Sequence, residues 1–140
     1  MRRDRLQEVM WWKSIYGRNH GAMEIKAFFE NVPLSKTRKL KKGEDDANLI
    51  LRFDPQDGEP LLVPCMWDTN DADEMTLYSF ALITDEPNPE VAAAGHDRTP
   101  VIMKFSNIDL WLSTGGQDVS IYEKVFDDKR PTYFAHEIAA

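Results

Sequence analysis

Cysteine is almost absent from this sequence of 140 residues, in which Cys65 is the only one. A single cysteine excludes an internal disulfide and is typical of proteins from a reducing compartment. No apolar run approaches the roughly 18 residues that a membrane helix needs. The polar start MRRDRLQEV has no apolar stretch like that of a signal peptide. We therefore expect a soluble, cytoplasmic protein with no membrane partner.

Motifs for metal, cofactor and hydrolase chemistry are also missing. The three histidines lie too far apart in the sequence for a local zinc motif, and there is no second cysteine. The acidic run DTNDADE has calcium-like spacing, but Ala72 and Asp73 stand where a calcium loop needs a ligand and a glycine. The sequence has neither a Gly-x-Ser-x-Gly motif nor a phosphate-binding glycine loop. We expect no metal and no cofactor.

Charge is unevenly distributed along the chain. The net charge of −7 argues against bulk binding of nucleic acid. Residues 1–42, however, hold eleven Lys and Arg against four Asp and Glu, whereas residues 43–140 hold six against twenty. A basic first third can offer phosphates a local patch. The alternative is that the basic and acidic parts neutralise each other in the fold.

Hydrophobic periodicity predicts a mixture of helices and strands. Helices are expected at residues 2–16, 89–94 and 106–112, and the tail from residue 121 to 134 is expected to be a short helix followed by an extended end. Strands are expected at residues 23–32, 49–53, 60–67, 76–84 and 100–105. These elements do not alternate regularly, which favours an α+β fold with a mainly antiparallel, curved or barrel-like sheet flanked by short helices. The length is that of one domain spanning residues 1–140, large enough to bury a core.

Local signals predict how two of these elements are bounded. Asp57-Gly58 is typical of a tight turn, so the strands on either side of it are expected to form a hairpin. Ser106 with Asp109 is the pattern of a capping box, which predicts the start of the following helix.

The most polar segment of the chain follows a short predicted helix. Asn88 suits the N-cap, Pro89 the first helical position and Gly95 a left-handed C-cap. His96 then directly follows the helix C-terminus, whose dipole favours an imidazolium, and histidine can transfer protons near neutral pH. Arg98 has the same strand parity, and its guanidinium suits phosphate or carboxylate. Spacing alone leaves two readings open: a site, or a histidine that only bonds the last helix carbonyls.

Glu30 is a second candidate, because it ends the predicted strand containing AFFEN. A carboxyl group beside aromatic side chains has its pKa raised by desolvation, which is the condition for a general acid. The alternative reading is a glutamate that faces solvent at a strand end.

The segment ALITDEPNPEVAAAGHDRTPVIM resembles the SOS-response-associated peptidase family, also called abasic-site processing proteins. That family has a strand ending in Thr, a short helix with Asn near its start, a His-Asp/Asn-Arg-Met-Pro-Val-Ile segment and a Trp-Leu pair. The matching residues are Thr84, Asn88, His96, Asp97, Arg98, Pro100, Val101, Ile102, Trp111 and Leu112. Weaker similarity adds Glu30, Trp67 and Arg2. The resemblance covers nearly the whole chain, but only the later two thirds of the family's sequence.

The resemblance implies a chemistry for these residues. In the family, an N-terminal cysteine exposed by removal of Met traps the aldehyde of an abasic site in single-stranded DNA as a thiazolidine. Glu30 and His96 would be the catalytic residues, as proton-transfer groups, and Arg98, Thr84 and Arg2 would contact the DNA. Autoproteolysis at the same N-terminus is also attributed to the family.

The sequence departs from this pattern at its start. Met1 is followed by Arg2 and Arg3, so we expect a chain that lacks the family's N-terminal portion, either as a fragment or because its start was assigned too late. Cys65 cannot replace the nucleophile, because a thiazolidine needs amine and thiol on one residue. Three hypotheses remain. One is an abasic-site processing protein unable to crosslink, and another is a non-catalytic module that binds single-stranded DNA or a protein. The third is a decayed gene product with no activity, which predicts poor folding on its own.

Overall fold

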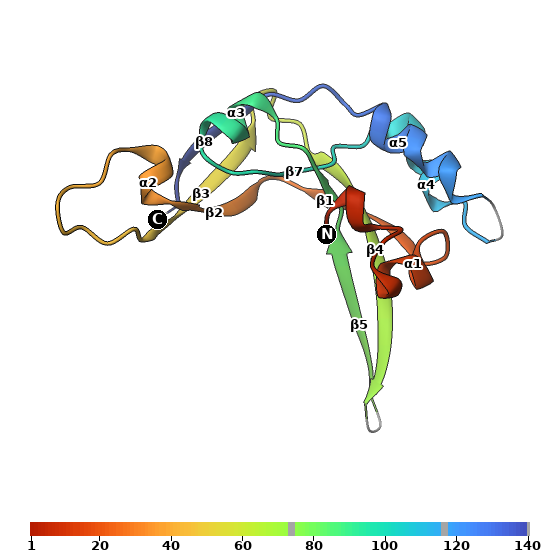
Figure 1. The fold of residues 1–140 in the computed structure, drawn as a ribbon. Helices are drawn as coiled ribbons and strands as arrows, with labels where there is room; N and C mark the ends of the chain where they lie inside the picture. The colour runs from red at the N-terminus through yellow and green to blue at the C-terminus, as the bar shows by residue number, and fades with distance from the viewer. Residues whose placement is uncertain (73–74, 116–117, 140) are drawn as a thin grey trace. The chain divides into compact units, whose positions relative to one another are not determined.

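The computed structural model describes residues 1–72, 75–115 and 118–139, which form two compact units. The first unit contains Met1–Glu24, Leu62–Asp85 and Pro100–Pro131. The second unit contains Ile25–Leu61, Glu86–Thr99 and Thr132–Ala140. Short helices accompany small antiparallel sheets, which confirms the predicted α+β class, although the sheets are open rather than closed into barrels (Figure 1). The prediction of a single domain over residues 1–140 stays a prediction.

The first unit combines one sheet with a cluster of short helices (Figure 1). Its strands are β1 (His20–Ile25), β4 (Leu61–Ala72), β5 (Met75–Leu82) and β6 (Thr84–Asp85). The sheet has the strand order β1-β4-β5. Its helices are α1 (Met10–Ile15), α4 (Ile108–Leu112) and α5 (Glu123–Asp127), with 3-10 turns at Arg3–Arg5, Phe105–Asn107 and Val119–Tyr122. The large buried side chains of its core are Leu6, Met66, Ile83, Met103, Trp111, Tyr122 and Phe126.

A buried histidine organises this core. The ring of His20, which is 8% exposed, stacks on Trp111 with a centroid separation of 3.7 Å. The backbone N–H of Gly17 donates to His20 Nε2 at 2.8 Å, so the ring proton lies on Nδ1 and is donated to the carbonyl of Trp111 at 2.7 Å. The indole N–H of Trp111 donates in turn to the carbonyl of Gly21 at 2.7 Å. These partners fit the neutral imidazole, and burial lowers the pKa of His20 to about 4.

The second unit has the sheet order β2-β3-β8. These strands are β2 (Phe28–Pro33), β3 (Asn48–Pro55) and β8 (Phe134–Ile138). The unit also contains α2 (Leu34–Thr37) and α3 (Pro89–Ala93), and β7 (Thr99–Pro100) lies where the chain leaves it for the first unit. Phe28 and Phe53 stack at 5.0 Å, and Phe134 meets Phe28 edge-on at 5.2 Å. Because all three rings are buried, they form the centre of this unit.

Tertiary pairing overrides the predicted N-terminal elements. The helix expected at residues 2–16 is reduced to Arg3–Arg5 and α1, because Arg2 forms a parallel bridge with Thr84 and so stays extended. The strand expected at residues 23–32 is divided into β1 and β2, which belong to different sheets. The alternation of apolar and polar residues does not indicate that the chain passes from one sheet to another.

Three further predictions about element boundaries are wrong. The turn at Gly58 forms, with φ +72, but β3 and β4 join different sheets and make no hairpin. Residues 101–103 are buried but lie outside the named strands. A run of apolar residues predicts that a segment is buried, but it does not predict that the segment pairs in a β-ladder. No side chain caps the helical turns near Ser106, so the capping box is absent. The predicted C-terminal helix is present but ends at Asp127, and the predicted extended end is β8.

Within the described residues, no helix is both long enough and apolar enough to cross a membrane.

The burial of neutral His20 predicts that acid destabilises the protein. The unfolded chain binds a proton at His20 as the pH falls through about 6.5, whereas the folded chain resists protonation until about pH 4. The contribution of His20 to the free energy of unfolding is therefore complete above pH 6.5 and falls by up to about 3 kcal/mol as the pH is lowered to 4. Urea unfolding at pH 7 and at pH 4 measures this loss of stability. His20→Gln should lose stability at pH 7 and show a smaller difference between the two pH values. An equal difference in both proteins would show that His20 is not the titrating group.

Candidate functional site

Glu30 and His96 lie against each other in the second unit. Glu30 is in β2, and His96 follows α3. The distance between His96 Nε2 and Glu30 Oε2 is 3.1 Å, which is within hydrogen-bond range. Both side chains are largely removed from solvent, with exposed fractions of 10% for His96 and 25% for Glu30. The structure therefore brings together two predicted catalytic residues that are far apart in the sequence.

The end of α3 sets the position of His96. The N–H of Gly95 bonds the carbonyl of Ala92 at 3.0 Å, and the N–H of His96 bonds the carbonyl of Val91 at 3.2 Å. This double closure is a Schellman motif, and the φ of +98 at Gly95 confirms the predicted left-handed C-cap. The backbone of His96, rather than its imidazole, therefore satisfies the last helix carbonyls, and the imidazole remains available for Glu30.

The start of α3 is fixed differently from the prediction. Asn88 is the N-cap residue and Pro89 follows at the first position, as expected, but the Asn88 side chain does not cap the helix. Its amide donates to the carbonyl of Thr132 at 2.8 Å, and its backbone N–H donates to Thr99 Oγ1 at 2.8 Å. Asn88 therefore ties α3 to two other segments of the second unit.

One proton can be shared between Glu30 and His96. Burial raises the pKa of Glu30, while the charges of His96 and Arg98 oppose this shift. His96 Nδ1 lies 3.0 Å from the carbonyl oxygen of Arg98 and 3.3 Å from its backbone nitrogen, so either ring tautomer finds a partner in Arg98. Nε2 faces Glu30 Oε2, and a proton on either the ring or the carboxyl can bridge the two groups. A shared proton of this kind is the chemistry of an acid–base pair.

Arg98 places a guanidinium close to this pair. Its Nε donates to Asp97 Oδ1 at 3.2 Å, and 39% of the side chain is exposed. Arg98 therefore presents a planar, permanently charged group to solvent two residues after His96.

Thr84 and Arg2 lie together in the first unit. They form a parallel β-bridge, and the backbone N–H and the hydroxyl of Thr84 donate to the carbonyl of Met1 at 2.7 and 3.1 Å. Arg2 Nε donates to Asp4 Oδ1 at 3.1 Å. The site residues predicted for DNA contact therefore fall into two groups, one in each unit.

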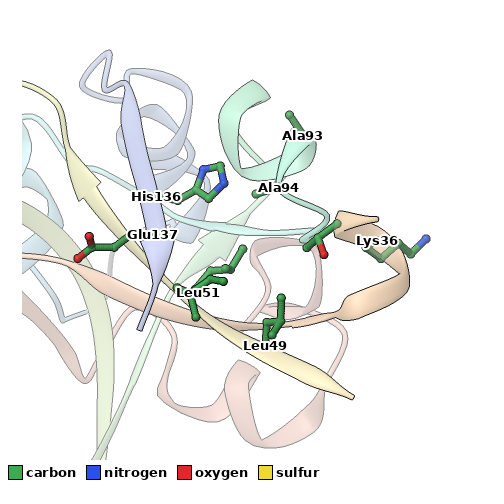
Figure 2. Close-up of a pocket in the computed structure, with 9 residues that line it drawn as sticks. Lys36, Leu49, Leu51, Ala93, Ala94, His136 and Glu137 are labelled. Carbon is green, nitrogen blue, oxygen red and sulfur yellow. The ribbon is translucent and has the colours of Figure 1, made fainter. Parts of the chain in front are cut away.

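A pocket of about 370 Å³ opens beside α3 in the second unit (Figure 2). Its aliphatic wall includes Leu51, which is opposite Glu30 in the β2–β3 ladder, and Ala94, which closes α3. In Figure 2, His136 points towards Ala94, whereas the Glu137 side chain extends from β8 in the opposite direction. The pocket thus adjoins the elements that hold Glu30 and His96, and the pair itself is outside its lining.

Neither a reactive thiol nor a metal cluster is found in the described parts of the chain. Cys65 is buried, and burial raises the pKa of its thiol. No group of three or more His, Cys, Asp or Glu among the described residues could hold a metal ion. Residues 73 and 74 of the acidic run lie outside the described residues.

Sequence reasoning missed the residues that position the site. Thr99 is buried and accepts a hydrogen bond from Asn88, and the carbonyl of Thr132 accepts another. The only signal in the sequence is that Thr99 stands where the resembling family has methionine. A hydroxyl in place of a thioether introduces a hydrogen-bonding group, but its partner cannot be read from the sequence.

The fold is shared with solved structures of low sequence identity. A protein from Bacteroides thetaiotaomicron matches with a TM-score of 0.69 at 16% identity, over 99% of this chain and 57% of its own. A Bordetella bronchiseptica protein gives 0.68 at 17%, over 99% and 64%, and a phage-related protein from the same organism gives 0.66 at 18%, over 99% and 62%. The chain therefore spans about three fifths of the length of these proteins. No curated protein sequence matches it significantly.

This α+β fold defines the structural class, and the sequence defines the family. The model of the SOS response associated peptidase (SRAP) family matches residues 1–138. The chain belongs to the SRAP family, which confirms the resemblance, and this membership supports a role related to DNA damage.

The reversal at Gly95 predicts a substitution that disturbs the site. A Cβ at Gly95 would lie 2.6 Å from Lys36 Cβ and 3.0 Å from Val32 Cγ1, and φ is positive. Gly95→Ala should cost roughly 2–4 kcal/mol of the free energy of unfolding, through backbone strain and overpacking together. Urea unfolding of the two proteins measures this cost.

Gly58→Ala is the matched control, since φ is +72 there and a Cβ would meet nothing within 4 Å. Its cost should be limited to the backbone strain of about 1–2 kcal/mol. Equal costs for the two substitutions would contradict a close approach of α2 and β2 to Gly95.

Proposed function

We propose that this protein acts on abasic sites in single-stranded DNA, with Glu30 and His96 as its acid–base pair and with Arg98, Thr84 and Arg2 as DNA contacts. The observation that carries the proposal is the 3.1 Å contact between Glu30 and His96, in a chain of the SRAP family. The cationic guanidinium of Arg98 supports it, because phosphates supply most of the affinity of DNA-binding proteins.

The acid–base pair suits the opening of an abasic sugar. In its closed form this sugar is a hemiacetal, and opening it requires removal of the proton from the anomeric hydroxyl and delivery of a proton to the ring oxygen. A base and an acid that share one proton can perform both transfers, because the pair ends with the same number of protons as it began. The raised pKa of Glu30 favours the protonated carboxyl needed for the second transfer.

Covalent trapping needs a group that the 140-residue polypeptide does not offer. A thiazolidine requires the amine and thiol of one N-terminal cysteine, whereas the single cysteine here is internal and buried. We propose that this polypeptide binds and opens abasic sites without forming a stable crosslink. The peptidase activity that gives the family its name would act at the same N-terminus.

A non-catalytic role is the second candidate, in which the chain binds single-stranded DNA or a protein. The basic composition of residues 1–42 favours it. In that case the Glu30–His96 pair would only stabilise the second unit. Binding to intact and abasic strands would then be equal, and Glu30→Gln would change stability alone.

Single-stranded DNA with one abasic site should give no stable covalent product. After incubation with the 140-residue polypeptide, a denaturing gel should show only unmodified strand, since Cys65 is internal and buried. A short peptide that begins with cysteine, incubated with the same strand, serves as the positive control, because it offers the amine and thiol of one residue to the aldehyde. A stable covalent band with the unaltered polypeptide would contradict the proposed need for an N-terminal cysteine.

Arg98→Ala should weaken binding to single-stranded DNA. Loss of one phosphate contact should lower the affinity for all strands about equally and reduce the slope of log K against log salt by about one. Fluorescence anisotropy over a salt series measures both quantities. Arg52→Ala is the matched control, because Arg52 is in the same unit, has 42% of its side chain exposed and pairs with Asp54. Equal losses for both variants, or no binding at low salt, would contradict the role of Arg98.

A further inference from the structure

The pocket beside α3 lies on the same face of the second unit's sheet as Glu30. Residues directly opposite each other in an antiparallel ladder point to the same face. Glu30 is opposite Leu51, and Leu51 is opposite Ile138, so these three side chains form one row across β2, β3 and β8. Leu51 and Ile138 line the pocket. Neighbouring strands are about 4.8 Å apart, so the pocket lies within one or two strand spacings of Glu30.

The walls of this pocket are mostly aliphatic. In Figure 2, Leu49 and Leu51 point from β3 to the side of the sheet on which α3 lies, where Ala94 forms the opposite wall. Ile138 adds an aliphatic side chain of which 64% is exposed. The volume of about 370 Å³ is that of a small ligand site, and it can hold a flat group the size of a nucleobase.

Two groups that can form hydrogen bonds stand at the rim of the pocket. The hydroxyl of Thr37 donates to the carbonyl of Leu34 at 2.9 Å, so its oxygen can still accept a hydrogen bond. The imidazole of His136 contacts the Phe53 ring at 5.6 Å and has no hydrogen-bond partner among the described residues. Bases carry donors and acceptors on their edges. Thr37 and His136 can therefore meet the edge of a base whose faces contact the aliphatic walls.

Positive charge adjoins the pocket at α2. Lys36 lines it, and in Figure 2 its side chain points outward from α2. Residues 36–42 contain five Lys and Arg and no Asp or Glu. Of the acidic residues that follow, Glu44 is paired with Arg38 and Asp46 accepts from Ser35. The segment that continues from this rim is therefore suited to an anionic backbone.

Glu137 is the one acidic residue in the pocket lining, and its side chain does not face the pocket. It is opposite Arg52 in the β3–β8 ladder, so both side chains belong to the other face of the sheet. Figure 2 accordingly shows Glu137 extending away. An aliphatic hollow with a cationic rim is complementary to a nucleotide, whose base is flat and largely apolar and whose phosphate is anionic.

We propose that this pocket binds one base of the single-stranded DNA on which the Glu30–His96 pair acts, with the adjoining phosphate at Lys36. The inference rests on the proposed function and adds to it a subsite for the nucleotide next to the abasic one. An abasic nucleotide has no base of its own to be held. A neighbouring base in the pocket would keep the strand in register with Glu30, which lies on the same face of the sheet.

Strands with stable abasic analogues test this subsite with the complete chain. The first probe is a short thymidine strand with one tetrahydrofuran nucleotide. Two further strands carry a second tetrahydrofuran, either on its 5′ or on its 3′ side. Loss of the base that occupies the pocket should weaken binding at least about fivefold, as for a stacked base, whereas loss of the other should have little effect. Fluorescence anisotropy measures the three affinities.

Ile138→Glu and Ile50→Glu form a matched pair of variants. Both isoleucines are exposed, so neither substitution should prevent folding, but Ile50 precedes Leu51 in β3 and points to the opposite face. Ile138→Glu should weaken binding of the first strand at least about fivefold and remove the difference between the strands, because base and side chain act at one place. Ile50→Glu should preserve both the affinity and the difference.

Nuclear Overhauser effects locate the base directly. Thymine methyl protons should give effects to the methyl groups of Leu49, Leu51 or Ile138 in the complex with the first strand. Equal effects of the two glutamate variants, or equal affinities for the three strands, would overturn the subsite and leave the proposed function standing. Absence of binding to every strand at low salt would overturn both.

Discussion

The reversal of the chain at Gly95 is the constraint on which the candidate site depends. A positive φ at this residue lets two hydrogen bonds close α3 before the chain turns back. His96 emerges from that turn with its backbone already bonded, so its imidazole can meet Glu30 of β2. Val32 and Lys36 approach Gly95 so closely that no larger residue fits. Backbone geometry and packing therefore act at one position to bring His96 against Glu30.

The first unit has a comparable centre in His20 and Trp111. Stacking and hydrogen bonds to both ring nitrogens hold the histidine neutral in the core, where an imidazolium would be poorly solvated. The two histidines therefore differ through their partners. His20 contacts carbonyl, N–H and aromatic groups and is structural, whereas His96 contacts a carboxylate whose own pKa is raised. The same residue type is packed in the core of one unit and contacts a carboxylate in the other.

The sequence predicted the backbone around the candidate site better than it predicted the strands. The short helix and its left-handed cap were recognised because Asn88, Pro89 and Gly95 act through local backbone chemistry. The hairpin at Gly58 was wrong because a turn signal describes only a few residues and does not say which sheet the next strand joins. The segment 101–103 was assigned to a strand because it is apolar, but apolar residues are equally buried outside a ladder.

The hydrogen-bond partners of particular side chains could not be predicted from the sequence. Asn88 was expected from its type to cap the helix, and in the fold it bonds the carbonyl of Thr132 instead. The position of β5 at the end of its sheet could not be predicted from the sequence either. The sequence shows an apolar strand with no charge, and only the sheet order shows that β4 is its one neighbouring strand among the residues that the structure describes.

By itself, the sequence determined the family and the α+β class and offered Glu30, His96 and Arg98 as candidates, because motif residues and local propensities are encoded at short range. The tertiary structure alone decided that Glu30 and His96 touch and that His20 is buried on Trp111. Each of these depends on contacts between segments far apart in the chain, whose free energies arise only when the units have packed.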